Sequence, residues 1–532
     1  MKTRYDAIII GGGHNGLVCA AYLARAGLEV LVLERRPVIG GAAVSEETVP
    51  GFTFSTFSYV MSLLHPKIIR ELELRRFGLE VLPASDLFCP VDGKDFLLLS
   101  EDVAKTQASF ARFSRRDAET YPAFARHLEE CAGLVRRFLF ETPPDPARGD
   151  LRGRTETLAL LWRHRRIGRG FHRLVDLFTL SAADFLDRWF ESPIIKAVFA
   201  YYASIGTFAG PRSPGSAYVI LHHVMGEHEG AAGWGFVRGG MGAISRALAE
   251  SGKRFGVAIA TEAEVAEIRI RDGQAQGVVL ADGREFQAPI VAANLHAKLL
   301  YERLIGARHL PAEVLADIRH YRTVSTAFKI NIAASAPPAY TAFDPERAGI
   351  DYPAYVHIAP DLDWLERAFD DAKYGRFSAR PFMTPVVPTV RDTTIAPPGR
   401  HVVHLFGGHA PYTLREGNWK EAKDRFARTV LETLELFAPG FSSHIIDMQV
   451  LAPPDIEAIL NLPGGHIFHG ELAPDQLFWK RPIPGYADYR TPIRGVYLCG
   501  SSAHPGGGVS GIPGHNAARE ILRDRRWRRL RS

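Results

Sequence analysis

The sequence predicts an α/β protein whose central parallel sheet is assembled from distant parts of the chain. Three observations support this prediction: a strand-helix-strand unit at the N-terminus, a group of short strands between residues 265 and 293, and an apolar strand near residue 494. A chain of 532 residues is too long for one ordinary core, so two joined domains are expected. The hydrophobic content of 46% is sufficient to fill such interiors.

The first unit begins with Tyr5 to Ile10, a mostly apolar run without helical period that stops at three glycines. Such a run is typical of a buried parallel strand. Residues 15–26 repeat apolar side chains at helical spacing, and Gly27 stands where a helix C-cap belongs. Residues 30–33 predict a second buried strand, which completes a β-α-β unit.

Further strands are predicted far downstream. Asp272-Gly273 and Asp282-Gly283 are turn signals between short strand-like runs. The predicted strands cover residues 265–270, 276–280, 285–287, 290–293 and 494–499, and residues 513–522 predict a helix with a proline in its first turn.

The glycines after the first strand have the spacing of a dinucleotide-binding loop, Gly11-x-Gly13-x-x-Gly16. Gly11 permits a tight turn, Gly13 lets a pyrophosphate approach the backbone, and Gly16 lets helix and strand pack closely. Glu34 follows the second strand, where a carboxylate can accept hydrogen bonds from ribose hydroxyls. The unit therefore predicts a Rossmann-like fold.

Two more glycine clusters favour FAD over NAD as the cofactor. Gly40-Gly41 provides a further close backbone approach, which an FAD molecule stretched across the fold requires. Gly500 to Gly514 contains many glycines and leads into the last predicted helix. Bare backbone there can pass close to a flat ring system, and the helix start can stabilise negative charge on it.

The sequence lacks the motifs of a dithiol redox centre and of a second dinucleotide-binding site. Cys19, Cys89, Cys131 and Cys499 form no C-x-x-C pair, which disfavours a dithiol redox centre and a zinc ribbon. A second G-x-G-x-x-G after a strand is also missing, so the expected electron acceptor is oxygen, a quinone or another carrier. Sparse cysteines and the lack of an apolar run of about 18 residues favour a cytoplasmic protein.

Two stretches are strongly basic. Residues 148–173 contain eight arginines against two acids, and residues 523–531 contain six against one. Such stretches can bind an anionic membrane, so a peripheral membrane contact is one interpretation. The favoured alternative is a solvated helix face and a frayed tail, because neither stretch has dense aromatic interleaving or a nucleic-acid motif. No nucleic-acid partner is expected.

The sequence resembles the phytoene-desaturase-like flavoproteins, and within them the branch with a pyridine nucleotide-disulphide oxidoreductase domain. Two positions depart from related flavoproteins, since Ala42 replaces a frequent arginine and Ser501 replaces a common aspartate. The segments that carry the resemblance are residues 33–43, 50–52, 58–64, 239–242 and 499–514.

The resemblance implies a discontinuous, Rossmann-like FAD-binding domain of residues 1–70, 230–300 and 490–532. The α+β substrate domain would be inserted as residues 71–229 and 301–489. It also implies that FAD binds non-covalently, with contacts to the pyrophosphate and ribose from Gly11, Gly13, Gly16, Glu34, Gly40 and Gly41, to the adenine end from Val265, and to the flavin from Gly500, Gly506, Gly507, Gly508 and Gly511.

Histidines are the candidates for proton transfer. His466 and His469 precede the strand that leads to the late glycine loop, and His504 lies within that loop. A base near the substrate can take the proton that accompanies hydride loss to a flavin. The alternative is a structural role for each histidine, with His504 ordering its loop. His222 and His223, with Glu227 to Glu229, suggest a metal site, which is disfavoured because adjacent histidines on a helix point in different directions.

These features predict an FAD-dependent dehydrogenase, desaturase or oxidase that moves hydride from a C–H bond of a small, largely apolar substrate to the flavin. A flavin amine oxidase is the second interpretation, disfavoured because the loop from Ser501 to Gly511 has no Tyr or Trp for an aromatic cage. A non-catalytic FAD-binding scaffold is the third.

Overall fold

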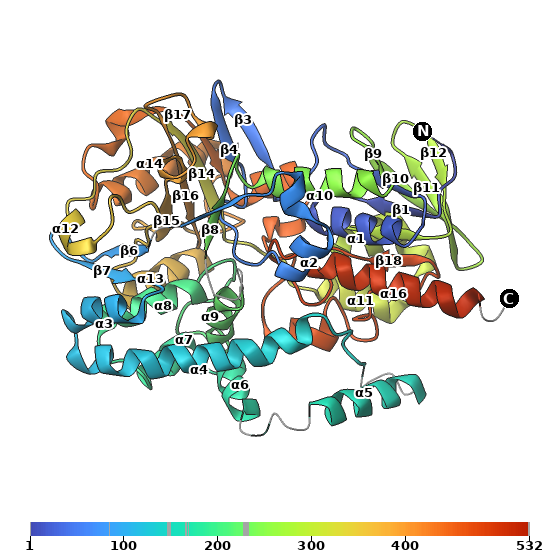
Figure 1. Cartoon of the computed structure of the whole chain (residues 1–532), viewed down its shortest axis with the longest axis horizontal. Coiled ribbons are helices and arrows are strands. Elements are labelled where there is room, and N and C mark those ends of the chain that lie inside the picture. Colours follow the sequence, from blue (N-terminus) through green and yellow to red (C-terminus); the bar gives the residue numbers. More distant parts are fainter. Residues whose placement is uncertain are drawn as a thin grey trace.

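The computed structural model describes residues 2–84, 86–145, 151–164, 168, 170–226 and 234–529. At one end lies a five-stranded parallel sheet with the order β18-β13-β1-β2-β9 (Figure 1). Its strands are β1 (Ala7–Ile10), β2 (Val30–Leu33), β9 (Ala258–Ala260), β13 (Val291–Ala293) and β18 (Val496–Leu498). The predicted parallel sheet from distant segments is therefore present.

Three helices pack together beside this sheet (Figure 1). They are α1 (His14–Arg25), α10 (Gly242–Arg254) and α16 (Ile512–Arg529). α16 continues well past the predicted end at residue 522, so the described part of the basic tail is helical rather than frayed.

A three-stranded antiparallel sheet adjoins the parallel one and consists of β10 (Val265–Arg271), β11 (Gln274–Leu280) and β12 (Glu285–Gln287). The turn from β10 to β11 contains Asp272 and Gly273, both with positive φ, of 50° and 68°. Both residue types tolerate this left-handed conformation, which explains why the turn was visible in the sequence.

A second, antiparallel sheet has the order β15-β16-β14-β17. Its strands are β14 (Phe328–Ala334), β15 (Met383–Val386), β16 (His401–Gly407) and β17 (Ile445–Leu451). Phe328 and Ile330 pack in a common core with α14 (Trp419–Glu435). Two further helices belong to the sequence between β14 and residue 460, namely α13 (Leu362–Lys373) and α15 (Pro453–Leu460). Because side chains alternate along a strand, Lys329 and Asn331 point to the other face, where they bond to the backbone after β4 (Phe52–Ser55).

The remaining large part is helical, with its own core of aromatic and aliphatic side chains (Figure 1). The helices are α3 (Val103–Ala111), α4 (Arg115–Leu139), α5 (Leu151–Arg163), α6 (Gly170–Thr179), α7 (Ala182–Asp187), α8 (Pro193–Ala203) and α9 (Ala217–Val224). The other described α-helices are α2 (Pro66–Glu71), α11 (Ala312–His320) and α12 (Pro345–Ala348). The other described strands form the pairs β3 (Ser45–Val49) with β4, β5 (Val81–Pro83) with β8 (Gly235–Val237), and β6 (Leu87–Pro90) with β7 (Phe96–Leu99). None of the described helices is both long and apolar enough to cross a membrane.

Candidate functional site

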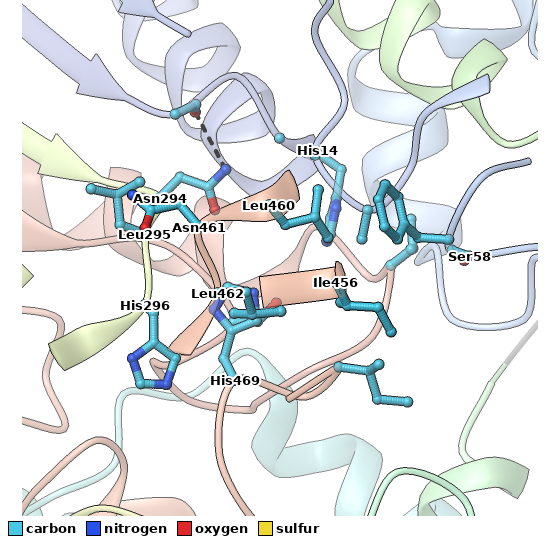
Figure 2. A pocket seen from close by; sticks show the side chains of 18 of the residues that line it. His14, Ser58, Asn294, Leu295, His296, Ile456, Leu460, Asn461, Leu462 and His469 are labelled. Atoms are coloured by element: carbon cyan, nitrogen blue, oxygen red, sulfur yellow. Dashed lines mark hydrogen bonds between the residues drawn. The ribbon is translucent and has the colours of Figure 1, made fainter. Parts of the chain in front are cut away.

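A cavity of about 280 Å³ lies where the carboxyl ends of the parallel strands face the four-stranded antiparallel sheet of β14 to β17. Ligands of open α/β sheets bind at this edge. Figure 2 shows side chains entering it from α1, from the residue after β13 and from α15 with the turn that follows it. Residues that line it from these directions include His14, Asn294, Ile456 and Leu462.

Glycines form one wall at the start of α1. A β-carbon on Gly16 would lie 2.2 Å from the Gly11 carbonyl oxygen, so only glycine lets α1 pack against this turn. Gly13 is the N-cap of α1 without a side-chain hydrogen bond, and the first turn has no acidic side chain. The N–H groups and the positive end of the helix dipole are therefore available to a phosphate.

Glu34 lines the cavity directly after β2 and is 8% exposed. Its Oε2 accepts a hydrogen bond from the Gly12 N–H (2.7 Å), and its Oε1 accepts one from the Arg36 N–H (2.9 Å). Each carboxylate oxygen has a further lone pair, which a ribose hydroxyl can use. Glu34 thus shapes the glycine loop and faces the cavity at the same time.

Gly40 and Gly41 lie beside the same loop. The Gly40 N–H donates to the Gly12 carbonyl (2.9 Å), and Gly13 and Gly40 form a β-bridge. Their φ values are 125° and 57°, in the region that favours glycine. Val265, at the start of β10, lines the cavity as well.

Asn294 connects the early and late glycine clusters and was missed in the sequence. Its Nδ2 donates to the Gly11 carbonyl (3.3 Å), the bond drawn dashed in Figure 2. A β-carbon on Gly500 would lie 2.9 Å from the Asn294 Oδ1. The available signal was a polar residue directly after a buried strand, at the edge where ligands bind.

The late glycine loop is divided between two cavities. Gly508 lines the large cavity, whereas Gly507 lines a second, separate one. The other predicted glycines do not line the large cavity. β-carbons on Gly506 and Gly511 would lie 3.3 Å from Arg481 Nε and 2.9 Å from Ile68 Cδ1, so these two glycines permit close packing. Among the early glycines, Gly16 and Gly40 do not line the large cavity either, and direct cofactor contact stays a prediction for every glycine of both clusters.

Arg481 is fully buried and packs against the late glycine loop. Its guanidinium donates to the carbonyls of Ser501 (2.9 Å), Gln476 (3.3 Å) and Phe468. Bonds from a charged donor are strong, and several together fix the loop geometry. Nothing in the local sequence pattern indicated this role.

Part of the cavity lining is aromatic. Tyr59 and Phe406 contact each other with ring centroids 5.2 Å apart, and Trp234 and Phe468 also belong to this part. The sequence argument against an aromatic lining considered only the loop from Ser501 to Gly511. The structure supplies aromatic side chains from other segments.

Lys329 is the one buried lysine in this lining within the described residues, and it is 2% exposed. Its Nζ donates to the carbonyls of Ser55 (2.7 Å) and Phe57 (2.9 Å) and lies 4.9 Å from the centre of the Tyr59 ring. Burial holds the pKa of this amine well below its ordinary value of 10.5. When this amine is neutral it has two N–H groups and one lone pair; the two carbonyls then accept from both N–H groups, and the lone pair can accept a proton.

The three histidines predicted for proton transfer do not converge on one point. His469 lines the large cavity, near His296, and burial lowers its pKa to about 3 (Figure 2). His466 is fully buried, does not line the cavity, and its Nε2 lies 3.4 Å from Glu471 Oε1. His504 lines the second cavity, and its Nε2 donates to the Phe138 carbonyl (2.9 Å). A histidine with a pKa of about 3 is a weak base at neutral pH, so the position of His469 in the lining does not by itself make it a proton acceptor.

The suggested metal ligands His222 and His223 have ring planes 85° apart, and His223 Nδ1 donates to the Val219 carbonyl (2.8 Å). Glu227, His228 and Glu229 lie outside the described residues. Within residues 2–84, 86–145, 151–164, 168, 170–226 and 234–529, no group of three His, Cys, Asp or Glu side chains could hold a metal ion.

Comparison with known proteins adds three findings. Residues 16–348 match the family described as flavin containing amine oxidoreductase. A rat protein, pyridine nucleotide-disulfide oxidoreductase domain-containing protein 2, is 41% identical over 548 residues, which cover 98% of this chain and 94% of that protein. The lycopene-forming phytoene desaturase of Pseudescherichia vulneris is 26% identical over 525 residues, covering 95% of this chain and 96% of the desaturase.

Among solved structures, an oxidoreductase from Methanosarcina mazei superimposes with a TM-score of 0.61 at 18% identity. The match covers 97% of this chain and 99% of that one. This agreement confirms the predicted Rossmann-like α/β fold.

Proposed function

Because this chain belongs to the family of flavin-containing amine oxidoreductases and is an FAD-dependent oxidoreductase, we propose that it takes a hydride from a C–H bond of a largely apolar, uncharged substrate. The family and the relatives confirm the predicted cofactor and the resemblance to phytoene-desaturase-like flavoproteins. The choice of substrate is our inference from the cavity.

The residues around the glycine loops fit FAD. The N-terminus of α1 offers unused N–H groups to the pyrophosphate, and Glu34 offers carboxylate lone pairs to a ribose. His14, the first residue of α1, also lines the cavity. When bound, FAD supplies the hydride acceptor.

The observation that carries the proposal is the composition of the aromatic part of the cavity lining. The described residues there include Tyr59, Trp234, Phe406 and Phe468 but no carboxylate, since the two acids of the lining, Glu34 and Glu264, come from the ends of the parallel strands and the adjoining sheet. A protonated amine would be buried without a counter-ion, which is costly. An uncharged substrate avoids this cost.

Lys329 provides the second half of the reaction in this proposal. The substrate loses a hydride to the cofactor, and a proton on the neighbouring atom passes to the free lone pair of Lys329 Nζ. The electron pair of that second bond forms the new double bond, so atoms and charge balance. The electrons leave later to oxygen or a quinone, because the sequence contains neither a second dinucleotide loop nor a dithiol.

Anaerobic mixing of the yellow holoprotein with matched donors tests the proposal. The donors share a carbon skeleton and carry a hydrogen, a hydroxyl or an amino group at one position. Bleaching of the flavin by the uncharged members supports hydride transfer from an apolar substrate. Bleaching by the amines alone identifies an amine oxidase, which the family name and the aromatic lining favour as the second candidate. A flavin that no donor bleaches points to a binding protein.

A further inference from the structure

A second cavity of about 270 Å³ lies on the other side of the late glycine loop. It is enclosed by side chains from α4, α6 and α9 and by residues 477–478 and 504–507. Leu63 and His222 line both cavities, so the two are adjacent at these residues. The lining is mainly aliphatic and aromatic, with Val135, Phe138, Leu139, Leu174, Phe178, Leu477 and Phe478.

The few polar groups in this lining are uncharged at neutral pH. Burial lowers the pKa of His65 and of His504 to about 4, and that of His222 well below its ordinary value of 6.5. Burial also raises the pKa of Tyr218 to about 12. With no charged side chain among the described lining residues, the cavity suits an uncharged, apolar ligand.

The junction between the cavities has an unused polar atom. His222 is 5% exposed, and its Nε2 has no hydrogen-bond partner. Because His222 and Leu63 line both cavities, the two cavities meet at these side chains, and the unpaired Nε2 faces this junction rather than a protein hydrogen-bond partner.

The far end of the second cavity reaches the surface at α6. Phe171 lines the cavity and is 62% exposed, so one side chain belongs to both the lining and the surface. On the same helix Leu174 lines the cavity and is buried, whereas Val175 is exposed. Consecutive residues of a helix do not face the same way, and this places one side of α6 over the cavity mouth.

We propose that the second cavity binds a hydrocarbon chain of the substrate and that this chain crosses between Leu63 and His222 into the large cavity. The inference rests on the proposed function, which it extends by naming a substrate with a reacting end and an apolar chain. Binding of the remote chain orients the reacting C–H bond, since contacts far from the chemistry contribute to positioning.

Crystals of the FAD-bound protein soaked with 1-bromodecane give a direct test. The bromine can be located by its anomalous scattering. A bromine peak among Leu174, Tyr218 and Phe478 supports the site, and bromine found solely elsewhere overturns it. This measurement uses the unaltered chain and does not depend on any variant folding.

Titration of the FAD-bound protein with decanol tests the same site in solution. Leu174→Phe fills the cavity and should weaken decanol binding at least about tenfold, provided that the yellow FAD absorbance is retained. Val175→Phe makes the same kind of change one residue further along α6, toward solvent, and should leave the affinity within about twofold. Equal affinities for the two variants overturn the proposal.

The two proposals fail in different ways. If decanol binds in the second cavity but no uncharged donor bleaches the flavin, the proposed function is wrong and the site stands. If short uncharged donors bleach the flavin but 1-bromodecane and decanol do not occupy the second cavity, the function stands and the site is wrong.

Discussion

The Glu34 carboxylate accepts hydrogen bonds from the N–H groups of Gly12 and Arg36, and it also lines the cavity where the ribose is expected. Glu34→Ala should weaken FAD binding roughly tenfold to a hundredfold, because a charge-assisted bond contributes about 1.5 to 3 kcal/mol. Titration of apoprotein with FAD, followed by flavin fluorescence at constant salt, measures the effect. Glu47→Ala on the exposed β3 strand is the control. An unchanged Kd for Glu34→Ala would place the adenosine half elsewhere.

Lys329 should control flavin reduction without controlling FAD affinity. Lys329→Met removes the proton acceptor and should slow reduction by about 10²- to 10⁴-fold, the usual range for general base catalysis. The wild-type rate should rise with pH and level off well below pH 10.5, because the pKa of Lys329 is lowered and only the neutral amine accepts a proton. Stopped-flow absorbance across pH measures both effects.

The matched control for this experiment is Lys196→Met on α8, a partly buried lysine that pairs with the exposed Asp187 and does not line the cavity. This variant should behave like wild type. A pH-dependent rate that persists in Lys329→Met would assign the proton to another group.

At the scale of elements, Gly16 and Gly133 are both helical glycines with opposite surroundings. A β-carbon on Gly16 would meet the Gly11 carbonyl at 2.2 Å, whereas one on Gly133 in α4 would meet nothing within 4 Å. Gly16→Ala should therefore cost about 1 to 3 kcal/mol and reduce FAD retention. Gly133→Ala should be neutral or stabilise by up to about 1 kcal/mol. Thermal unfolding compares the two, and equal melting temperatures would contradict the close packing of α1.

The elements that sequence patterns could predict are those whose signals are local. β2 and β12 begin and end where predicted, and β10, β13 and β18 lie within or near their predicted ranges, because glycines and turns bound each apolar run. The strands of the four-stranded antiparallel sheet (β14 to β17) and the helices of the helical part were not predicted individually. Their burial depends on contacts between segments hundreds of residues apart.

The residues of the candidate site likewise fall into those that local sequence patterns predict and those that depend on contacts between distant segments. The loop of Gly11 to Gly16 and Glu34 follows from spacing within one β-α-β unit, and the structure places Gly11, Gly13 and Glu34 in the cavity lining, with Gly16 packed behind Gly11. Asn294 and Lys329 join the cavity only because distant strands come together. Lys329 did leave a local signal, a single lysine within an otherwise almost apolar strand, but spacing alone could not say what it faces. The division of the chain into two domains stays a prediction.

At the scale of the whole molecule, many buried histidines make stability depend on pH. Burial lowers the pKa of His14, His223 and His504 to about 4 and of His409 and His469 to about 3. The unfolded chain binds protons below pH 6.5 while the folded protein does not, so the free energy of unfolding should fall as the pH drops from about 6.5 toward 4.

Each such histidine contributes up to about 1.4 kcal/mol per pH unit in this window. Urea unfolding at pH 7 and pH 5 measures the loss. His409→Asn should show a shallower decline, because both ring nitrogens of His409 lack partners and Asn tolerates its φ of 60°. A stability that does not change between pH 7 and pH 5 would contradict the neutral state of these side chains.

The two basic segments, residues 148–173 and 523–531, are connected by an ion pair between α5 and α16, and we call the surface around this pair the basic face. Arg523 of α16 pairs with Glu156 of α5, which brings the tail beside α5, where Leu158 and Trp162 are exposed. We propose that this face contacts an anionic membrane, as one interpretation of the sequence suggested. The protein should then bind phosphatidylserine vesicles at low salt and dissociate as salt is raised.

Vesicle cosedimentation of two variants checks the face. Trp162→Ala should reduce binding, whereas Tyr374→Ala, which removes an equally exposed aromatic side chain outside this face, should not. Equal binding to neutral phosphatidylcholine vesicles would contradict an electrostatic contact.

The strand order of the parallel sheet has a consequence for biosynthesis. β1 sits between β2 and β13, and β13 is in turn covered by β18, which begins at Val496. At about 5 to 20 residues per second, a ribosome needs roughly 13 to 50 s after β2 to deliver β13, the strand that covers β1. During that time the nascent chain carries β1 as an open, apolar edge, the kind of edge that invites aggregation. The lining of the large cavity runs from Ile10 to Val509, so the flavin site is complete only when nearly the whole chain has been synthesised.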